Sequence, residues 1–415
     1  MRKKLIATAL TIVLILPTML FPLSGCSSTP VMAETLDLMA GINPRNISIE
    51  LDITQGSEAA IDFAVRLFQY SLSPEESSLI SPLSVLCALA MTANGADGNT
   101  KAQMEEALGF SVAELNGYLY LYIKSLAENN GCEFHLANSI WFRDVDWLKV
   151  EEDFLQLNAD YYGAEIYKAP FNDDTLKSIN QWVSDNTRGM IDSILDRIDP
   201  NDIMHLINAL AFEAEWQTVY TESQIRDGIF TSKSGDKRDV KMMYSEESVY
   251  LDDGSATGFI KYYTGGRYAF AALLPNEGIS IDDYISTLTG PGLADTLRNA
   301  QSTKISVAIP RFEGEYKIEM SDILKNMGII DAFSDYLADF TKLSSASIGN
   351  IYIDGVLHKT FISVDEKGTK AGAGGGVLVT VVSPMRYVYL NRPFVYILLD
   401  CDTNLPFFIG TVLDL

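Results

Sequence analysis

The sequence predicts an α+β domain. Most segments with helical spacing of apolar residues lie before residue 190, and most strand-like segments lie after residue 240. Helices and strands that are segregated along the chain in this way are typical of α+β folds. Hydrophobic residues make up 47 % and charged residues 21 % of the 415 residues, so the chain has both the composition and the length to bury a large core. No repeat, proline-rich linker or charge block divides residues 57–415, which predicts one continuous domain.

The helices are predicted from apolar periodicity and from capping residues. In the segment 57–70, apolar residues recur at helical spacing. Ser81 followed by Pro82 is a plausible N-cap and first turn for an apolar helix over 83–91. Further helices are predicted over 101–108, 112–126, 175–187 and 320–327, and the pattern allows a short one over 36–42.

The predicted strands are short apolar or β-branched runs. Two of them, 134–142 and 205–212, precede the strand-rich half of the chain. After residue 240 the predicted strands are 259–263, 268–274, 305–310, 377–382 and 394–399.

The first 25 residues are typical of an export signal and not of the fold. Arg2, Lys3 and Lys4 precede an uncharged stretch over 5–21 that is too short and wrongly flanked for a membrane span. Leu23-Ser24-Gly25-Cys26 then resembles the bacterial lipobox, which implies cleavage before Cys26 and a lipid on that cysteine; the alternative is a chance cysteine after an ordinary signal. We therefore expect a lipoprotein signal peptide over 1–25, a membrane-proximal tether over 26–52 and the folded domain over 53–415. Such a protein would be exported and anchored outside a bacterial cell membrane, or extracellular.

Composition excludes several classes of function. Lys and Arg number 31 against 55 Asp and Glu, a formal charge of −24, which argues against a nucleic-acid partner. The common nucleophile, zinc and phosphate-loop motifs are absent, and three dispersed histidines offer no metal spacing, so we expect neither an enzyme nor a metal or cofactor. A glycosidase-type carboxylate pair is compatible with the count of acids, but nothing singles one out. A disulfide between Cys132 and Cys401 is compatible with export, whereas Cys87 lies in an apolar run.

The segment 361–394 is the most informative part of the sequence. It admits two plain interpretations, a glycine-rich hairpin linker and a dinucleotide-binding loop. The second fails because a β-branched run over 377–382, and not a helix, follows the glycines. The segment instead resembles the reactive-centre loop of the serpins, a family of suicide protease inhibitors. The residues that match the hinge of that loop are Glu366, Lys367, Gly368 and Thr369, followed by Lys370, Ala371, Gly372, Ala373 and Gly374.

The resemblance extends over residues 57–415. Ordered matches include Leu79-Ile80-Ser81-Pro82-Leu83-Ser84, Asn138-Ser139-Ile140-Trp141, Leu206-Ile207-Asn208-Ala209, His358-Lys359 and Asn391-Arg392-Pro393-Phe394. The chain is accordingly identified as a member of the serpin family, of a bacterial lipoprotein type. This membership implies about eight or nine helices around three β-sheets, an exposed reactive-centre loop and a monomeric protein that traps a serine protease as a covalent acyl complex.

Loop spacing predicts the bond that a target protease would cleave. Glu366 and Asn391 are 25 residues apart, similar to the usual inhibitory length, and counting from either end places the scissile bond at Val382–Ser383. A β-branched residue there suits elastase-like or subtilisin-like proteases, with Val381 and Thr380 as alternatives. Arg386, which would attract trypsin-type enzymes, lies four residues beyond Val382.

The loop pattern also bears on the mechanism that the family implies, in which the cleaved loop inserts into the central sheet. Starting at Thr369, alternate residues through Val381 are all small or apolar, as a strand facing a core requires, and the charged Lys370 falls on the other face. Gly372 and residues 374–376 depart from the usual alanine-rich hinge, and glycine weakens a strand by roughly 0.5–1 kcal/mol. A non-inhibitory serpin, acting as a protease substrate or as a binding or chaperone-like protein, is therefore the alternative.

Five further residues match positions that control insertion in serpins. Ser81, Ser84, Asn208 and His358 correspond to the polar cluster that governs opening of the central sheet, and each also has a plain local role as a cap or a buried hydrogen-bonding group. Trp216 corresponds to the tryptophan where insertion begins, with core packing as the alternative. The neighbouring Glu213-Ala214-Glu215 departs from the family's basic and glycine-containing pattern.

Overall fold

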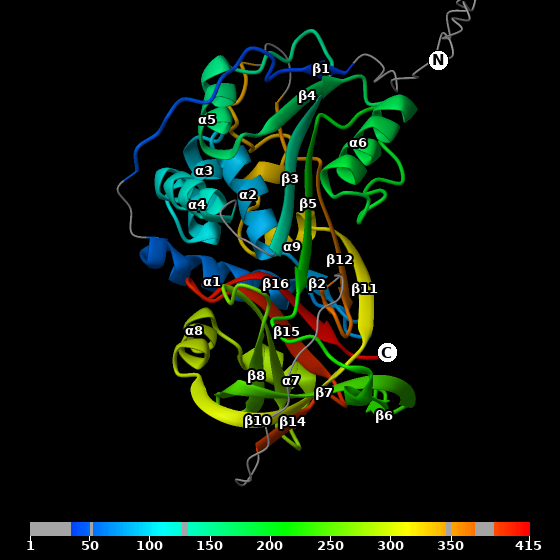
Figure 1. Ribbon diagram of the computed structural model, residues 1–415. Coiled ribbons are helices and arrows are strands. Elements are labelled where there is room, and N and C mark those ends of the chain that lie inside the picture. The colour runs from blue at the N-terminus through cyan, green and yellow to red at the C-terminus, as the bar shows by residue number, and fades with distance from the viewer. Residues whose placement is uncertain (1–34, 50–52, 127–131, 346–349, 370–385) are drawn as a thin grey trace, which may run out of the picture. The chain divides into compact units, whose positions relative to one another are not determined.

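The computed structural model describes residues 35–49, 53–126, 132–345, 350–369 and 386–415 (Figure 1). These residues fall within one compact unit, 33–415. The predicted signal peptide and the predicted strand over 377–382 lie outside the described residues. The predicted site residues outside them are Cys26, Lys370, Ala371, Gly372, Ala373, Gly374, Val382 and Ser383.

Nine α-helices occur in the part of the chain that the structure describes. They are α1 (Ile53–Tyr70), α2 (Pro82–Ala93), α3 (Gly98–Leu108), α4 (Val112–Leu126), α5 (Glu152–Tyr162), α6 (Asp173–Asn186), α7 (Ile281–Thr287), α8 (Gly290–Arg298) and α9 (Ser321–Asn326). The predictions of α1 to α4, α6 and α9 are confirmed. Helix α2 begins as its sequence predicts, with the Ser81 side chain accepting a hydrogen bond from the Ser84 N–H. Helices α5, α7 and α8 were not predicted; α7 and α8, with seven and nine residues, are too short to show a clear period.

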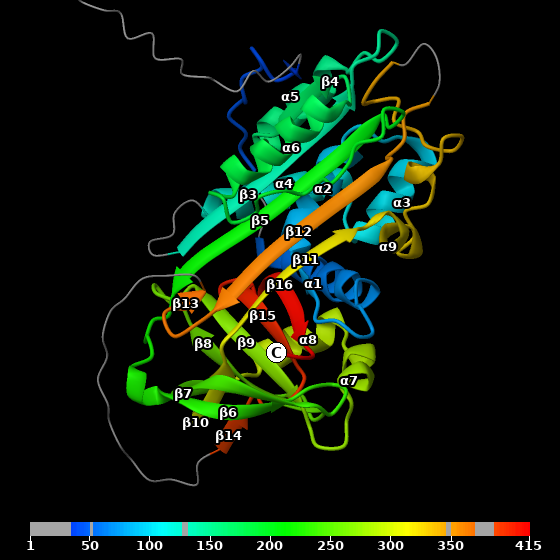
Figure 2. The same cartoon turned by 90° about the vertical axis from the view of Figure 1, so that its right-hand side faces the viewer.

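The central sheet has the strand order β1-β4-β3-β5-β13-β12-β11 (Figure 2). Its strands are β1 (Leu36–Asp37), β4 (Glu165–Ala169), β3 (Cys132–Arg143), β5 (Met204–Glu215), β13 (Gly368–Thr369), β12 (Gly355–Val364) and β11 (Phe312–Glu319). Strands β5 and β12 pair directly and in parallel from His205 opposite Gly355 to Leu210 opposite Thr360. Beyond that point the short strand β13 lies between them.

The second sheet has the order β14-β10-β7-β8-β9-β15-β16-β2, with β6 paired to β7. Its strands are β14 (Arg386–Tyr389), β10 (Gln301–Pro310), β7 (Lys237–Asp252), β8 (Ala256–Tyr262), β9 (Tyr268–Pro275), β15 (Phe394–Asp400), β16 (Leu405–Val412), β2 (Leu79–Ile80) and β6 (Ile225–Thr231). The family resemblance led us to expect three sheets in all. The described strands form two sheets instead, because two of the expected sheets are joined by hydrogen bonds through β7. With 16 residues, β7 is long enough to pair with β6 near its start, with β8 near its end and with β10 between.

The segment 35–49 lies on the folded domain. The short helix that the pattern allows over 36–42 does not form: Leu36–Asp37 is a strand paired with β4, because its backbone finds partners on that sheet edge. Further on, the Arg45 guanidinium donates from Nε to Asp160 Oδ2 at 2.8 Å, and the Arg45 backbone N–H donates to Asp160 Oδ1 at 2.7 Å. Residues that we expected in a tether therefore contact β4 and α5.

The core lies where α2 packs between the two sheets. Every residue of α2 is buried, and the helix contacts β3 and β5 of the central sheet and β16 of the second. A smaller apolar cluster, which includes Trp141, Ile179 and Trp182, packs α6 against the central sheet. Within the described ranges, no helix combines the length and apolar character needed to cross a membrane. Because α2 is enclosed, Ser81, which caps it, and Ser84 in its first turn are fully buried.

Candidate functional site: the gap between β5 and β12

The hinge is a tight hairpin that has already entered the central sheet. Val364 at the end of β12 pairs with Thr369 of β13, and the turn between them closes when the Asp365 N–H donates to the Gly368 carbonyl at 3.0 Å. The Asp365 carboxylate accepts from the N–H groups of Lys367 and Gly368 at 2.7 and 3.2 Å. The first two strand residues of the hinge thus stand between β5 and β12, with the turn held by one carboxylate.

Gly368 occupies a position where only glycine fits. A Cβ on it would stand 2.1 Å from the carbonyl oxygen of Ala214 and 2.8 Å from the Cα of Glu215, both backbone atoms of β5. Thr369, only 3 % exposed, follows with its hydroxyl hydrogen-bonded to that of Tyr263. Thr369 therefore points into the core, the direction that the alternation of the loop assigns to it.

Trp216 holds the hinge turn directly. Its indole Nε1–H donates to the Asp365 carbonyl at 2.9 Å, and its backbone N–H donates to the Lys367 carbonyl at 2.8 Å. The ring stacks on Tyr263, with centroids 4.6 Å apart and planes 5° from parallel. Trp216 thus packs in the core and bonds to the hinge turn, and its role as the point where insertion begins stays a prediction.

Two other residues contact Glu366. The Tyr220 N–H donates to the Glu366 carbonyl at 2.9 Å, and Arg311 forms an ion pair with the Glu366 carboxylate at 2.7 Å. Sequence reasoning missed Tyr220 and Arg311, because each is distant from Glu366 in the sequence and meets it only in the tertiary structure.

The four predicted cluster residues come together where β5 and β12 pair directly. Asn208 of β5 and His358 of β12 are paired in register, and Ser81 and Ser84 approach them from the start of α2. All four residues have zero exposure. His358 Nε2 accepts from the Ser81 N–H at 3.0 Å, and His358 Nδ1 lies 3.0 Å from Asn208 Oδ1, which also accepts from the Ser84 hydroxyl. The cluster therefore ties the two strands that the loop would separate to the buried helix behind them.

These contacts determine the protonation of His358. A backbone N–H can only donate, so Nε2 is the acceptor nitrogen, and the ring proton resides on Nδ1, from which it is donated to Asn208. Burial lowers the pKa of His358 to about 3. The ring is therefore neutral at physiological pH, and a second proton would leave two N–H groups facing each other at Ser81.

Asn138 is a fifth member of the cluster that sequence reasoning did not assign. It lies on β3 opposite Asn208, whose amide donates to Asn138 Oδ1 and to the Ser84 carbonyl. Its identity was visible in the matched segment, but its contact depends on the register of β3 with β5.

Two other candidate features, a metal site and a disulfide, are not found among the described residues. Among the residues that the structure describes, no group of three or more His, Cys, Asp or Glu side chains is arranged to hold a metal. Cys87, Cys132 and Cys401 are free thiols, and burial raises the pKa of Cys132 and Cys401 to about 12. These thiols are therefore protonated, and the suggested disulfide is not formed in this structure.

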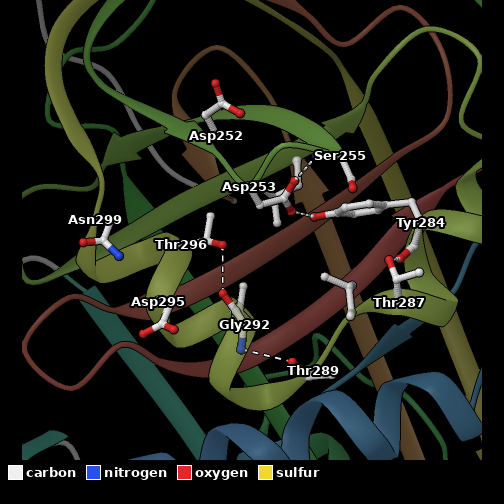
Figure 3. A pocket seen from close by; sticks show the side chains of 13 residues that line it. Asp252, Asp253, Ser255, Tyr284, Thr287, Thr289, Gly292, Asp295, Thr296 and Asn299 are labelled. Carbon is white, nitrogen blue, oxygen red and sulfur yellow. Dashed lines mark hydrogen bonds between the residues drawn. The ribbon is translucent and has the colours of Figure 1, made fainter.

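A cavity of about 450 Å³ lies away from the hinge, beside α7, α8 and the turn between β7 and β8 (Figure 3). Its polar groups serve local structure. Tyr284 donates to Asp253 at 2.8 Å, Asp253 also accepts from two backbone N–H groups of the turn, and Thr289 caps α8 by accepting from the Gly292 N–H. The cavity thus contributes no group to the gap between β5 and β12.

Comparisons with known proteins agree with this architecture. The family model described as Serpin (serine protease inhibitor) matches residues 58–415. The leukocyte elastase inhibitor of Equus caballus is 28 % identical over 362 residues, which is 82 % of this chain and 94 % of that protein. The crystal structure of tengpin, a thermophilic serpin, in its native state is 47 % identical, with a TM-score of 0.89 over 92 % of this chain and all of that one. Tengpin in its latent state gives a lower TM-score, 0.79, at 48 % identity over 89 % of this chain and all of that one.

The structure thus has a helix-covered sheet in which the hinge strand β13 lies between two parallel strands, β5 and β12. The chain belongs to the serpin family, whose members are generally inhibitors of serine proteases and not enzymes.

Proposed function

We propose that this protein inhibits extracellular serine proteases of elastase-like or subtilisin-like specificity by a suicide mechanism. The protease cleaves the loop near Val382–Ser383 and forms an acyl-enzyme. The loop then inserts between β5 and β12 and traps the enzyme before the ester is hydrolysed.

The observation that carries the proposal is the register of the seated hinge. Thr369 already pairs with Ala214 of β5 and with Val364 of β12, antiparallel to both. In antiparallel pairing, each further loop residue that joins the strand pairs with the residue one position earlier on β5 and with the residue one position earlier on β12. The strand that Thr369 begins therefore has a defined path along the gap.

Continuing that path by six residues brings Gly375 between Asn208 and His358, which at present pair directly with each other. Gly375 adds no side chain to the polar cluster, so this step requires the two strands to part without requiring room for a side chain. Direct pairing between β5 and β12 is replaced by pairing on both edges of the new strand, and this gain in backbone hydrogen bonds favours insertion.

The proposed protease class rests on Val382. A β-branched aliphatic residue at the cleavage position fits a small apolar specificity pocket, and the relative from Equus caballus is named as an inhibitor of leukocyte elastase. The glycines at 372 and 374–376 favour the second candidate, a serpin that is cleaved without trapping its protease.

The export signal and Cys26 support a place on the outer face of a bacterial membrane, with the protein monomeric and held by its lipid. There it would protect the cell envelope from extracellular proteases. Mass spectrometry of the N-terminal peptide tests this location, and an unmodified Cys26 or recovery only from the cytosol would contradict it.

The inhibition test mixes the mature protein, in detergent, with an elastase-type and a subtilisin-type protease. We expect a complex that survives denaturing electrophoresis and a released peptide that begins at Ser383. Clean cleavage without a complex would contradict inhibition of these enzymes. A matched variant with alanine at positions 374–376 then distinguishes slow insertion, which alanine would correct, from a wrong choice of protease.

A further inference from the structure

A buried lysine lies beside the residues that hold the hinge. Lys261 of β8 is 2 % exposed, and its Nζ lies 2.8 Å from Glu247 Oε1 and 3.3 Å from the Thr218 carbonyl oxygen. The Glu247 side chain is itself only 14 % exposed. Burial alone lowers the pKa of Lys261, but Tyr220 and Glu247 together raise it by more, which leaves the pKa above its ordinary value. A charged ammonium is therefore kept inside the protein, where charges are rare and costly.

The ammonium of Lys261 faces two aromatic rings. Its Nζ lies 4.5 Å from the ring centroid of Tyr220 and 5.3 Å from that of Trp216. A cation at this distance is attracted to the ring face, and more strongly where water is excluded. The Tyr220 hydroxyl also lies 3.2 Å from that of Ser245, which donates to Glu247 Oε1 at 2.6 Å and closes the network.

The same two aromatic residues hold the hinge turn. Trp216 donates to the carbonyls of Asp365 and Lys367, and Tyr220 donates to that of Glu366. Three consecutive hinge carbonyls are thus held by two residues whose rings face one buried charge.

We propose that Lys261 is a positioning residue for loop insertion: its ammonium fixes Trp216 and Tyr220, which keep the hinge turn seated with β13 between β5 and β12. This role deepens the proposed function and rests on it. The seated turn is the beginning of the inserted strand, so a hinge that leaves the gap must re-enter before insertion proceeds. Loss of the ammonium therefore slows insertion.

The direction of the change in insertion rate distinguishes a positioning role from a role in stabilising the fold. A mutation that only weakens the closed sheet makes it easier to open and speeds insertion. Loss of a positioning group slows insertion even when the fold is less stable.

The test replaces the ammonium with an apolar chain of similar length, Lys261→Met. Purified protein is warmed without protease, and insertion is followed as the gain in resistance to urea. We expect Lys261→Met to insert about tenfold more slowly than the wild type, equivalent to about 1.4 kcal/mol in the barrier. The matched control is Lys168→Met: Lys168 also holds one carboxylate and one carbonyl, those of Asp144 and Val145, each at 3.0 Å, but on β4. This control should insert at the wild-type rate.

The double variant Lys261→Met with Glu247→Gln removes the carboxylate that the single variant leaves unpaired. It should insert as slowly as Lys261→Met, which keeps the test valid if the single variant folds poorly. Restoration of the wild-type rate in the double variant would overturn the inference, as would unchanged or faster insertion in both. Failure of both to fold would also overturn it, because Lys261 would then serve the fold itself.

The assay is independent of any protease. Slower insertion by Lys261→Met, combined with no trapped protease in the wild type, would support the positioning role and contradict the proposed inhibition. A wild type that never inserts on warming contradicts the positioning role whatever the protease assay shows.

Discussion

Acidification from pH 7 to pH 5 should cost the native fold about 2 kcal/mol through His358 alone. An unfolded histidine has a pKa of about 6.5, whereas burial lowers the pKa of His358 to about 3 in the fold. Between these values the unfolded chain binds a proton that the native state excludes, so stability falls as the pH falls from about 6.5 towards 3. Above pH 6.5 this contribution is complete, and by pH 5 about one and a half pKa units of it, or about 2 kcal/mol, are lost.

The assay compares the wild type with His358→Gln, in which the Gln side-chain oxygen can still accept from the Ser81 N–H. Unfolding in urea, followed by circular dichroism at pH 7, 6 and 5, yields the free energy of unfolding of each protein. The variant is expected to be less stable at pH 7, but to lose about 2 kcal/mol less than the wild type between pH 7 and pH 5. The subtraction removes the titration of all other groups.

Ser84→Ala is the matched control. It deletes the hydroxyl that donates to Asn208 and so weakens the same cluster, but it leaves the titrating ring in place. It should therefore keep the pH dependence of the wild type. If His358→Gln and the wild type lose equal stability on acidification, His358 is not the buried neutral group that its contacts indicate.

Three further predictions concern the hinge and the buried polar groups. Gly368→Ala should unseat β13, because the new Cβ would stand 2.1 Å from a carbonyl oxygen of β5, and hydrogen exchange of the hinge should accelerate; Gly314→Ala, which meets nothing within 4 Å, should leave it unchanged. Asn208→Ala should lower the free energy of unfolding by about 3 kcal/mol, since buried partners lose their hydrogen bonds, and a loss below 1 kcal/mol in urea would refute the importance of the cluster. Asp400→Ala should cost about 1.5–3 kcal/mol in thermal unfolding because it removes two hydrogen bonds from the partly buried Arg267, which keeps Asp402 at 3.5 Å, and an unchanged melting temperature would show that the Asp400 pair adds nothing.

Local signals predicted six of the nine helices in the described residues. Helix α2 begins at the residue that its capping pair indicates, since a serine side chain can satisfy a free N–H of the first turn whatever the rest of the fold does. The short helix allowed over 36–42 was wrong because β4 offers strand pairing there, a partner more than 120 residues away in the sequence.

The candidate site was predicted in part. Ser81, Ser84, Asn208 and His358 were identified by resemblance, and the structure brings them into one hydrogen-bonded cluster. The fifth member, Asn138, was missed, because only the register of β3 with β5 shows that it faces Asn208.

By itself the sequence determined what depends on neighbouring residues: the capped start of α2 and the alternation of small residues in the loop. The tertiary structure alone decided that the hinge is already seated, that Trp216 and Tyr220 hold it, and that Lys261 is buried beside them. Lys261 is buried and paired with a carboxylate because β7, β8 and the end of β5 meet around it. The sequence does not indicate whether water or aromatic rings will surround a given lysine side chain.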